Sequence, residues 1–196
     1  MTQRIYLASR SPRRAELLQQ IGIVFEVLPS DIDESVVAGE APSAYVTRLA
    51  REKAEACLNA LQRDQAALLP ILAADTTVSI DGIILGKPES DEEAYAMLAR
   101  MSGRRHEVHT GIAVATGAGI EVALSTTYVE MDALTDDAIH AYIATGEPRD
   151  KAGAYGIQGL AGTFIKHIEG SYSGVMGLPI YETAALLKRA GIDVLG

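Results

Sequence analysis

Two adjacent arginines near the start of the chain form the first group of residues that could do chemistry. Arg13 and Arg14 follow Ser11 and Pro12, which fit the cap and the first position of a helix. Both guanidinium groups then lie in the first helical turn, where the helix dipole already places positive charge, so we expect an anion beside them. Together with the hydroxyl groups of Ser9 and Ser11, they predict a phosphate site. The alternative is that both arginines lie in solvent.

Asp75 is a strong candidate for a catalytic carboxylate. The apolar run 70–74 predicts a buried strand, with an interruption at 75–77 before the strand pattern resumes. A carboxylate at the end of a buried strand is well placed for chemistry. Glu34 would join it if the polar loop 29–42 folds back over the arginines.

Two lysines could add positive charge to the same site. Lys53 falls within the apolar stripe of a helix predicted over 42–62. Its ammonium group either passes the apolar neighbours to reach solvent or ends in a buried anion pocket. A hairpin turn at 81–82 returns Lys87 towards the level of Asp75.

Two acids among several cations favour chemistry at phosphorus. Such chemistry requires charge neutralisation by Lys, Arg and Mg²⁺, with carboxylates that hold the metal and a water aligned for attack. Asp75 and Glu34 would supply the metal and base functions, and Arg13, Lys53 and Lys87 would supply the positive charge.

Other chemical groups give weaker signals. The glycines at 153, 156 and 159 allow close approach of the backbone to a ligand, or equally a tightly packed turn. The histidines, at 106, 109, 140 and 167, show no partner in the sequence, so we expect neither a zinc site nor a Ser-His-Asp triad.

Composition limits the class of protein. The chain has 196 residues, enough for one domain or a single fold with two lobes. A net charge of −9 argues against a broad nucleic-acid or membrane surface. No apolar run approaches the roughly 20 residues of a spanning helix. Because Cys57 is the only cysteine, we expect no internal disulfide and a cytoplasmic location.

The elements that must position these residues alternate along the chain as in α/β proteins. A strand at 5–8, a helix at 13–21 and a strand at 23–28 open the pattern. A long antiparallel pair is predicted at 106–116 and 120–131, and the loop 169–177 is expected to be flexible. The remaining elements are predicted as helices at 91–101, 136–144 and 179–190 and a strand at 163–168.

A series of short motifs runs through the whole chain. In order they are Ser9-Arg10-Ser11-Pro12-Arg13-Arg14, Glu52-Lys53-Ala54, Ala74-Asp75-Thr76-Thr77-Val78, Gly86-Lys87-Pro88, Ser102-Gly103 with His106, Val108 and Thr110, Gly146-Glu147-Pro148 through Gly159, and Gly174-Val175-Met176-Gly177-Leu178-Pro179. In these motifs the sequence resembles the Maf family of nucleoside triphosphate pyrophosphatases.

The resemblance implies a fold and a reaction. The fold is an elongated, two-lobed α/β structure like that of the inosine triphosphate pyrophosphatase group, with a central mixed sheet flanked by helices. Residues 1–196 would form one Maf-like domain with two lobes around a central cleft. The implied reaction is hydrolysis of a nucleoside triphosphate to the monophosphate and pyrophosphate with a divalent metal, Mg²⁺ or Mn²⁺. The resemblance also suggests a homodimer.

The resemblance assigns roles to particular positions. Asp75 matches the proton acceptor. The places that handle phosphate and metal are matched by Ser9, Arg13, Glu34, Lys53 and Lys87, and Arg14 joins the substrate-binding set through the predicted anion site.

Three positions match those that separate two branches of the family. Arg13, Thr76 and Gln158 match the branch that resembles dTTP/UTP pyrophosphatases, in contrast to the branch that acts on 7-methyl-GTP. The side-chain amide of Gln158 could pair with the donor and acceptor edge of a pyrimidine.

Two alternative functions remain open at this point. One is a nucleotide-binding regulator of cell division or septum formation, a role with which the family has been associated, that binds without significant turnover. The other is an unrelated phosphatase, which would release free phosphate directly.

Overall fold

The centre of the molecule is a mixed sheet with the strand order β2-β1-β3-β5-β6-β7, and β4 pairs with β3 outside this path. This computed structural model describes residues 4–194. β1 is parallel to β2 and β3, whereas the other pairs are antiparallel. The strands are β1 (Arg4–Leu7), β2 (Val24–Val27), β3 (Ile71–Ile80), β4 (Ile83–Leu85), β5 (Arg105–Thr116), β6 (Gly119–Met131) and β7 (Ile165–Glu169).

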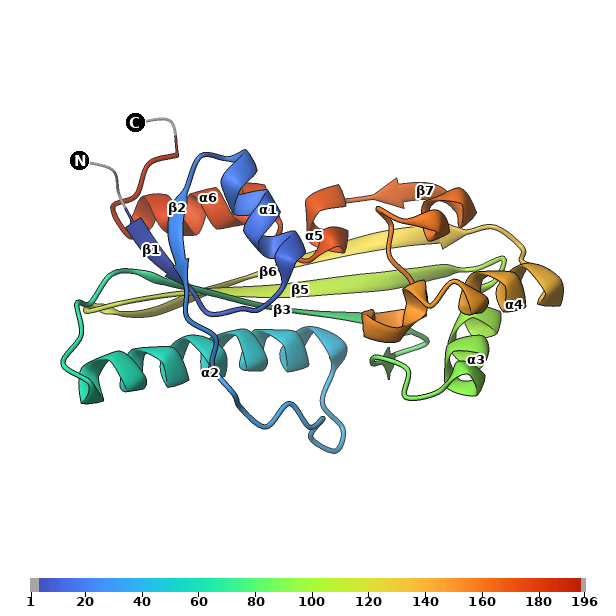
Figure 1. Ribbon diagram of the computed structural model, residues 1–196, viewed down its shortest axis with the longest axis horizontal. Coiled ribbons are helices and arrows are strands. Elements are labelled where there is room, and N and C mark those ends of the chain that lie inside the picture. Colours follow the sequence, from blue (N-terminus) through green and yellow to red (C-terminus); the bar gives the residue numbers. More distant parts are fainter. Residues whose placement is uncertain (1–3, 195–196) are drawn as a thin grey trace.

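Helices cover both faces of the long strands, which confirms the expected α/β fold with a central mixed sheet (Figure 1). One face carries α2, while α1, α5 and α6 lie over the other and α3 and α4 stand at the far end of the elongated molecule. The helices are α1 (Pro12–Gln20), α2 (Pro42–Arg63), α3 (Asp91–Met101), α4 (Asp136–Ala144), α5 (Tyr172–Met176) and α6 (Ile180–Arg189).

Three apolar clusters among the described residues hold these layers together. One fills the space between α2 and the sheet, the second lies under α1 and α6, and the third packs α3 and α4 against the far ends of the long strands. The predicted stripe of α2 is confirmed, because its buried residues are Val46, Leu49, Ala50, Lys53, Ala54, Cys57 and Leu61. Lys53 is thus placed in a layer that is otherwise apolar.

The predicted interruption at 75–77 is wrong, because β3 continues through it and stays paired with β5. Its polar side chains remain in a buried strand because distant residues partner them. The Lys53 Nζ lies 2.6 Å from the Asp75 Oδ1, and the Thr76 and Thr110 hydroxyl oxygens are 2.9 Å apart. Asp75 therefore lies in the middle of a strand and not at its end.

One edge of β3 is open beside Asp75. β1 pairs with β3 at Ile71 and Leu72, and β4 pairs with it from Val78 onward, whereas β5 covers the opposite edge. Among the described residues, no strand lies against the first edge over 73–77. This gap gives a ligand access to the middle of a buried strand.

The alternation of side chains along β3 divides the residues between the two faces. Asp75 stands directly opposite Gly111 of β5, and a Cβ on Gly111 would overlap the carbonyl oxygen of Val46 in α2. Since directly opposed residues share a face, Asp75 points to the α2 side. Thr76 comes next in the strand and points to the side of α1 and α5.

The predicted flexible loop at 169–177 is also wrong. It contains α5, whose N-terminus is capped where the Ser171 hydroxyl accepts the Gly174 N–H at 3.0 Å. Gly177 ends the helix in the left-handed region, at φ 118°. With five residues, α5 is too short to give a periodic pattern in the sequence.

The glycine-rich segment is a tightly packed turn. It contains the short helices η1 (Glu147–Asp150) and η2 (Ala152–Ala154) and leads into η3 (Leu160–Phe164). Side chains on its three spaced glycines would collide with other parts of the protein, namely Val78 for Gly153, Lys151 for Gly156 and Glu147 for Gly159. Close internal packing is thus present, and because Gly156 and Gly159 also line a cavity, their approach to a ligand stays a prediction.

Candidate active site

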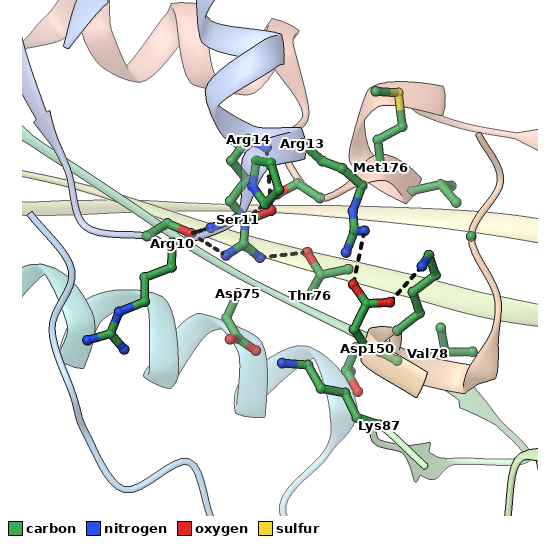
Figure 2. Close-up of a pocket in the computed structure, with 18 of the residues that line it drawn as sticks. Arg10, Ser11, Arg13, Arg14, Asp75, Thr76, Val78, Lys87, Asp150 and Met176 are labelled. Carbon is green, nitrogen blue, oxygen red and sulfur yellow. Dashed lines mark hydrogen bonds and ion pairs between the residues drawn. The ribbon is translucent and has the colours of Figure 1, made fainter. Parts of the chain in front are cut away.

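The predicted site residues line one cavity of about 1050 Å³ at the open edge of β3. Its wall is built from the turn between β1 and α1, the loop before α2, the segment after β4, and the turn 147–159 (Figure 2). It is lined by every residue predicted from the sequence, namely Ser9, Arg13, Arg14, Glu34, Lys53, Asp75, Thr76, Lys87 and Gln158.

A lysine shared by two carboxylates lies at the base of the cavity. Lys53 reaches from α2 to Asp75, with 2.6 Å between Nζ and Oδ1, and to Glu34, with 2.7 Å between Nζ and Oε1. The side chains of Lys53 and Asp75 are each 11% exposed, so solvent screens their attraction weakly. Of the two interpretations of Lys53, the buried anion pocket is correct.

The loop that carries Glu34 does fold back over the site, as the sequence-based hypothesis required. Glu34 is still 53% exposed at its side chain, so it forms the solvent side of the arrangement, whereas Asp75 forms the buried side.

These two carboxylates suit a hard divalent cation. Both direct an oxygen at a single positive charge, and oxygen ligands are those that Mg²⁺ and Mn²⁺ prefer. No group of three or more His, Cys, Asp or Glu among residues 4–194 is arranged to hold a metal. The donor set therefore fits an ion that takes its remaining ligands from water and phosphate, as Mg²⁺ usually does.

Arg14 is held by the protein on the α1 side of β3. Its Nε donates to the Gly177 carbonyl at 2.8 Å, and its two Nη atoms donate to the hydroxyls of Ser9 at 3.1 Å and Thr76 at 3.2 Å. Burial lowers the pKa of Arg14, and the Asp75 carboxylate acts in the opposite direction. The alternative of two solvated arginines is therefore wrong.

Thr76 belongs to a chain of hydrogen bonds whose direction is fixed. Thr110 donates its hydroxyl proton to the Gly174 carbonyl at 2.8 Å. It can therefore only accept from Thr76, at 2.9 Å between the two oxygens. Because Thr76 also accepts from Arg14, one lone pair of its hydroxyl oxygen is left for a ligand.

Arg13 spans the mouth of the cavity. Its Nη1 lies 3.7 Å from the Oδ2 of Asp150 in η1, and the side chain of Arg13 is 33% exposed. Asp150 also pairs with Lys151, at 2.6 Å between Oδ1 and Nζ, and Lys151 donates to the Glu147 carbonyl at 2.8 Å. Figure 2 shows this bridge between the first helix and the turn that closes the cavity.

Lys87 and Gln158 contribute the remaining predicted groups. In Figure 2 the ammonium end of Lys87 points towards Asp75 from the side opposite Arg14. Gln158 is an exposed residue of the glycine-rich turn that lines the same cavity. Three predicted cations, namely Arg13, Lys53 and Lys87, thus face the cavity that contains Asp75.

The sequence reasoning missed several residues of the cavity. Asp150, Lys151 and Tyr155 also line it, and Glu147 anchors the turn by accepting the Leu160 N–H at 2.9 Å. The motif 146–159 contains all four, but only its glycines and Gln158 were interpreted as chemical signals.

Two histidines have hydrogen-bond partners that were not visible in the sequence. His109 contacts Ser79 and Glu107 through Nε2, at 3.1 and 3.0 Å, and His106 Nε2 lies 2.7 Å from the Tyr155 hydroxyl. The first group is no catalytic triad, because serine and glutamate meet the same ring nitrogen and Ser79 is 1% exposed.

The fold and the cavity together define an α/β protein with a cleft that is lined by cations and carboxylates and has an acid–lysine pair at its base. The chain matches the family model described as "Maf-like protein" over residues 4–190. It belongs to the Maf family, which confirms the resemblance in its motifs.

The relatives of the chain are similar along nearly its whole length. A dTTP/UTP pyrophosphatase of Methylobacillus flagellatus is 67% identical over 193 residues, covering 98% of this chain and 96% of that protein. A nucleoside triphosphate pyrophosphatase of Haemophilus ducreyi is 50% identical over 195 residues, covering 100% and 99%. The solved Staphylococcus aureus Ham1 protein overlaps at a TM-score of 0.47 and 18% identity, covering 66% and 72%.

Proposed function

We propose that the protein is a nucleoside triphosphate pyrophosphatase that hydrolyses dTTP and UTP, and related pyrimidine nucleotides, to the monophosphate and pyrophosphate. The observation that carries the proposal is the buried Asp75 carboxylate, paired with Lys53, which also pairs with Glu34, in a cavity that Arg13 and Lys87 line too. The names of the relatives support the same reaction.

In the proposed reaction Asp75 takes the proton of a water that attacks the α-phosphorus. A new bond forms between the water oxygen and this phosphorus, and the bond to the oxygen that bridges the α- and β-phosphorus breaks. Pyrophosphate leaves with that oxygen and its electron pair. Arg13, Lys53 and Lys87, which line the same cavity as Asp75, would neutralise the charge of the triphosphate.

Glu34 and Asp75 would hold the divalent cation, Mg²⁺ or Mn²⁺. The cation would supply charge neutralisation at the phosphate oxygens. Lys53 lies between the same two carboxylates, so its ammonium would move towards the phosphates when the cation binds.

The base would be recognised at the other side of β3. Thr76 offers its hydroxyl oxygen and Gln158 its side-chain amide, which carries both a donor and an acceptor. Ser9 and Arg14 support this wall, because the guanidinium group of Arg14 joins the Ser9 and Thr76 hydroxyls.

The proposal extends to the setting of the enzyme. Residues 1–196 act as one unit, in which the two lobes are the walls of the cleft. The enzyme works in the cytoplasm, which agrees with its single, buried cysteine. No helix within residues 4–194 is long and apolar enough to cross a membrane. A homodimer is the assembly that the family suggests and stays a prediction.

Replacing the acid by its amide tests the role of Asp75. The Asp75→Asn variant keeps the shape of the side chain but cannot take a proton, so we expect turnover to fall about 10²–10⁴-fold. Pyrophosphate release from dTTP measures turnover, and circular dichroism checks that the variant is folded. Turnover close to that of the unchanged protein would refute the assignment.

The position of attack is tested with ¹⁸O-labelled water. Attack at the α-phosphorus places the label in the monophosphate, whereas label in pyrophosphate would mean attack at the β-phosphorus and would refute the mechanism. Tight nucleotide binding without pyrophosphate release, across metals and all common triphosphates, would favour the non-catalytic regulator instead. Free phosphate as the direct product would favour an unrelated phosphatase.

A further inference from the structure

The loop that carries Glu34 has no regular secondary structure of its own. Residues 28–41 contain neither helix nor strand, and most of residues 31–41 are exposed. Nevertheless the Glu34 carboxylate is placed 2.7 Å from the Lys53 ammonium. A segment of this kind keeps one geometry only where side chains from a rigid element hold it.

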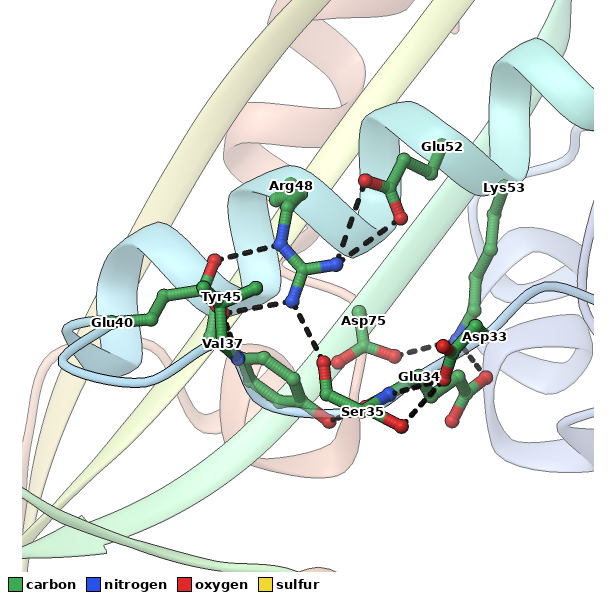
Figure 3. Close-up of polar contacts among 10 residues, drawn as sticks. All are labelled: Asp33, Glu34, Ser35, Val37, Glu40, Tyr45, Arg48, Glu52, Lys53 and Asp75. Carbon is green, nitrogen blue, oxygen red and sulfur yellow. Dashed lines mark hydrogen bonds and ion pairs between the residues drawn. The ribbon is translucent and has the colours of Figure 1, made fainter.

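Arg48 of α2 makes three of the hydrogen bonds that hold this loop (Figure 3). Its guanidinium group grips the Glu40 carboxylate with two bonds, from Nε to Oε1 at 2.7 Å and from Nη2 to Oε2 at 2.8 Å. Nη2 also donates to the Ser35 carbonyl at 3.1 Å, and Nη1 donates to Glu52 on the same helix at 3.2 Å. The contacts of Arg48 thus reach the residue directly after Glu34.

The two ends of the Arg48–Glu40 pair are partly shielded from water. The Glu40 side chain is 10% exposed and that of Arg48 is 26% exposed. The hydrogen bonds from Arg48 lower the pKa of the Glu40 carboxyl, so Glu40 stays ionised near neutral pH. Only the planar fork of an arginine makes such a two-bond contact, which the single ammonium of a lysine cannot reproduce.

Tyr45 adds a second contact from α2. Its hydroxyl donates to the Glu34 carbonyl at 2.9 Å. Burial, and then the nearby Asp75 carboxylate, raise the pKa of Tyr45 to about 12, so the hydroxyl keeps its proton. One helix therefore holds the backbone of Glu34 and of Ser35, and presents Lys53 to the Glu34 carboxylate.

We propose that Arg48 is a positioning residue for the hydrolysis. By holding the Ser35 carbonyl and the Glu40 carboxylate, Arg48 keeps the Glu34 carboxylate beside Asp75, where the divalent cation is to be bound. This inference rests on the proposed function, because it gives Glu34 a task that only metal-dependent chemistry requires. It adds to that function a residue that touches neither the metal nor the nucleotide.

The Arg48→Met variant removes the fork and keeps much of the aliphatic length. We expect the Mg²⁺ concentration for half-maximal pyrophosphate release to rise about tenfold, a loss typical of residues that orient a metal ligand. The affinity for Mn²⁺, measured by electron paramagnetic resonance with a non-hydrolysable triphosphate analogue, should fall by the same factor. Arg48→Lys should recover only part of the loss, because a lysine cannot grip Glu40 with two bonds.

The matched control is Arg51→Met on the same helix. The Arg51 side chain is exposed and makes no hydrogen bond or ion pair with the residues that the structure describes. The variant therefore removes the same charge as Arg48→Met without releasing the loop. Hydrogen exchange should quicken at 33–40 in Arg48→Met and stay unchanged in Arg51→Met. An unchanged metal requirement in Arg48→Met, or the same shift in Arg51→Met, would overturn the inference.

A double-mutant cycle separates this inference from the proposed function. If Arg48 acts through Glu34, adding Arg48→Met to Glu34→Gln should cause no further loss of Mn²⁺ affinity. A full additional loss would show that Arg48 acts by another route. If Glu34→Gln alone leaves the metal requirement unchanged, the proposed role of Glu34 fails; if Glu34→Gln raises it and Arg48→Met does not, only the positioning role fails.

Discussion

Lys53 has two carboxylate partners in the free protein, and this arrangement sets the behaviour of the site. Its ammonium pairs with Asp75 and with Glu34 at once, so one positive charge offsets part of the repulsion between the two acids. Breaking a buried ion pair by removing one partner is strongly destabilising, because the other charge is left without compensation. The lysine thus links stability and the proposed chemistry in a single side chain.

Thr76 and Gln158 allow a test of base selection at the residue scale. We expect Thr76→Ala and Gln158→Ala to change the ratio of kcat/KM for dTTP to that for GTP about 3–10-fold, the size of one lost hydrogen bond. Turnover of the best substrate should change less than this ratio does. Steady-state assays over a panel of triphosphates measure both quantities. An equal loss for every base would contradict the proposed role.

At the scale of elements, strand β5 carries a buried histidine, His106, that contacts a residue of the cavity wall. His106 begins the buried part of β5, and its Nε2 lies 2.7 Å from the hydroxyl of Tyr155, a residue that lines the cavity. Its Nδ1 has no partner among the described residues. Burial lowers the pKa of His106 to about 4, so the ring is neutral in the folded protein at neutral pH.

This histidine predicts a loss of stability in mild acid. The unfolded chain protonates His106 near its ordinary pKa of 6.5, whereas the folded protein resists protonation down to about 4. The unfolded state therefore binds more protons between these values, and the free energy of unfolding falls as the pH falls through this window. From pH 7 to pH 5 the contribution of His106 is about 2 kcal/mol.

Urea unfolding of the unchanged protein and of His106→Phe at both pH values measures this contribution. The variant should be less stable at pH 7, because the Tyr155 hydroxyl loses its partner, but its stability should change less between pH 7 and pH 5. Equal slopes in the two proteins would show that His106 does not cause the acid sensitivity.

Sequence periodicity predicted most elements because each has a local pattern. The stripe of α2 placed Lys53 on the buried side, and Ser11 with Pro12 predicted the start of α1 correctly. The polar residues 75–77 misled the prediction of β3, because the partners that keep them in a buried strand come from α2, α1 and β5. The sequence of one strand shows that these residues are polar. It does not show that residues from distant parts of the chain will form hydrogen bonds and ion pairs with them.

The candidate site was predictable to a similar extent and for the same reason. Family motifs and charge identified nine of the residues that line the cavity. The roles of Arg48 and Asp150 escaped notice, because they depend on contacts with residues distant in sequence, Ser35 and Arg13, that no periodic spacing predicts. Gly111 gave no signal in the sequence either, since its importance lies in what packs against it.

At the scale of the whole molecule, the cavity joins parts of the chain that are far apart in sequence. The Arg13–Asp150 contact already connects the first helix with the glycine-rich turn. A triphosphate that contacts both walls would bind the folded protein and not the unfolded chain. Binding should therefore raise the melting temperature.

We expect α,β-methylene-dTTP with Mg²⁺, at about 100 times its Kd, to add about 2.7 kcal/mol and raise the melting temperature by about 5–10 °C. Differential scanning fluorimetry measures the shift. Thymidine, which has the base but no phosphate, is the control and should give a much smaller shift. Equal shifts in melting temperature for the two ligands would mean that contacts with the phosphates do not stabilise the folded protein.

The absence of a side chain at position 111 determines how deep the acid lies. Gly111 lets α2 rest directly on the backbone of β5, at the position opposite Asp75. A single methyl group there would act as a wedge that lifts α2, and with it Lys53, Tyr45 and Arg48, away from the sheet. The Lys53 ammonium would move away from the Asp75 carboxylate, and the contacts of Tyr45 and Arg48 with the loop would shift with it. None of these residues would itself have been changed.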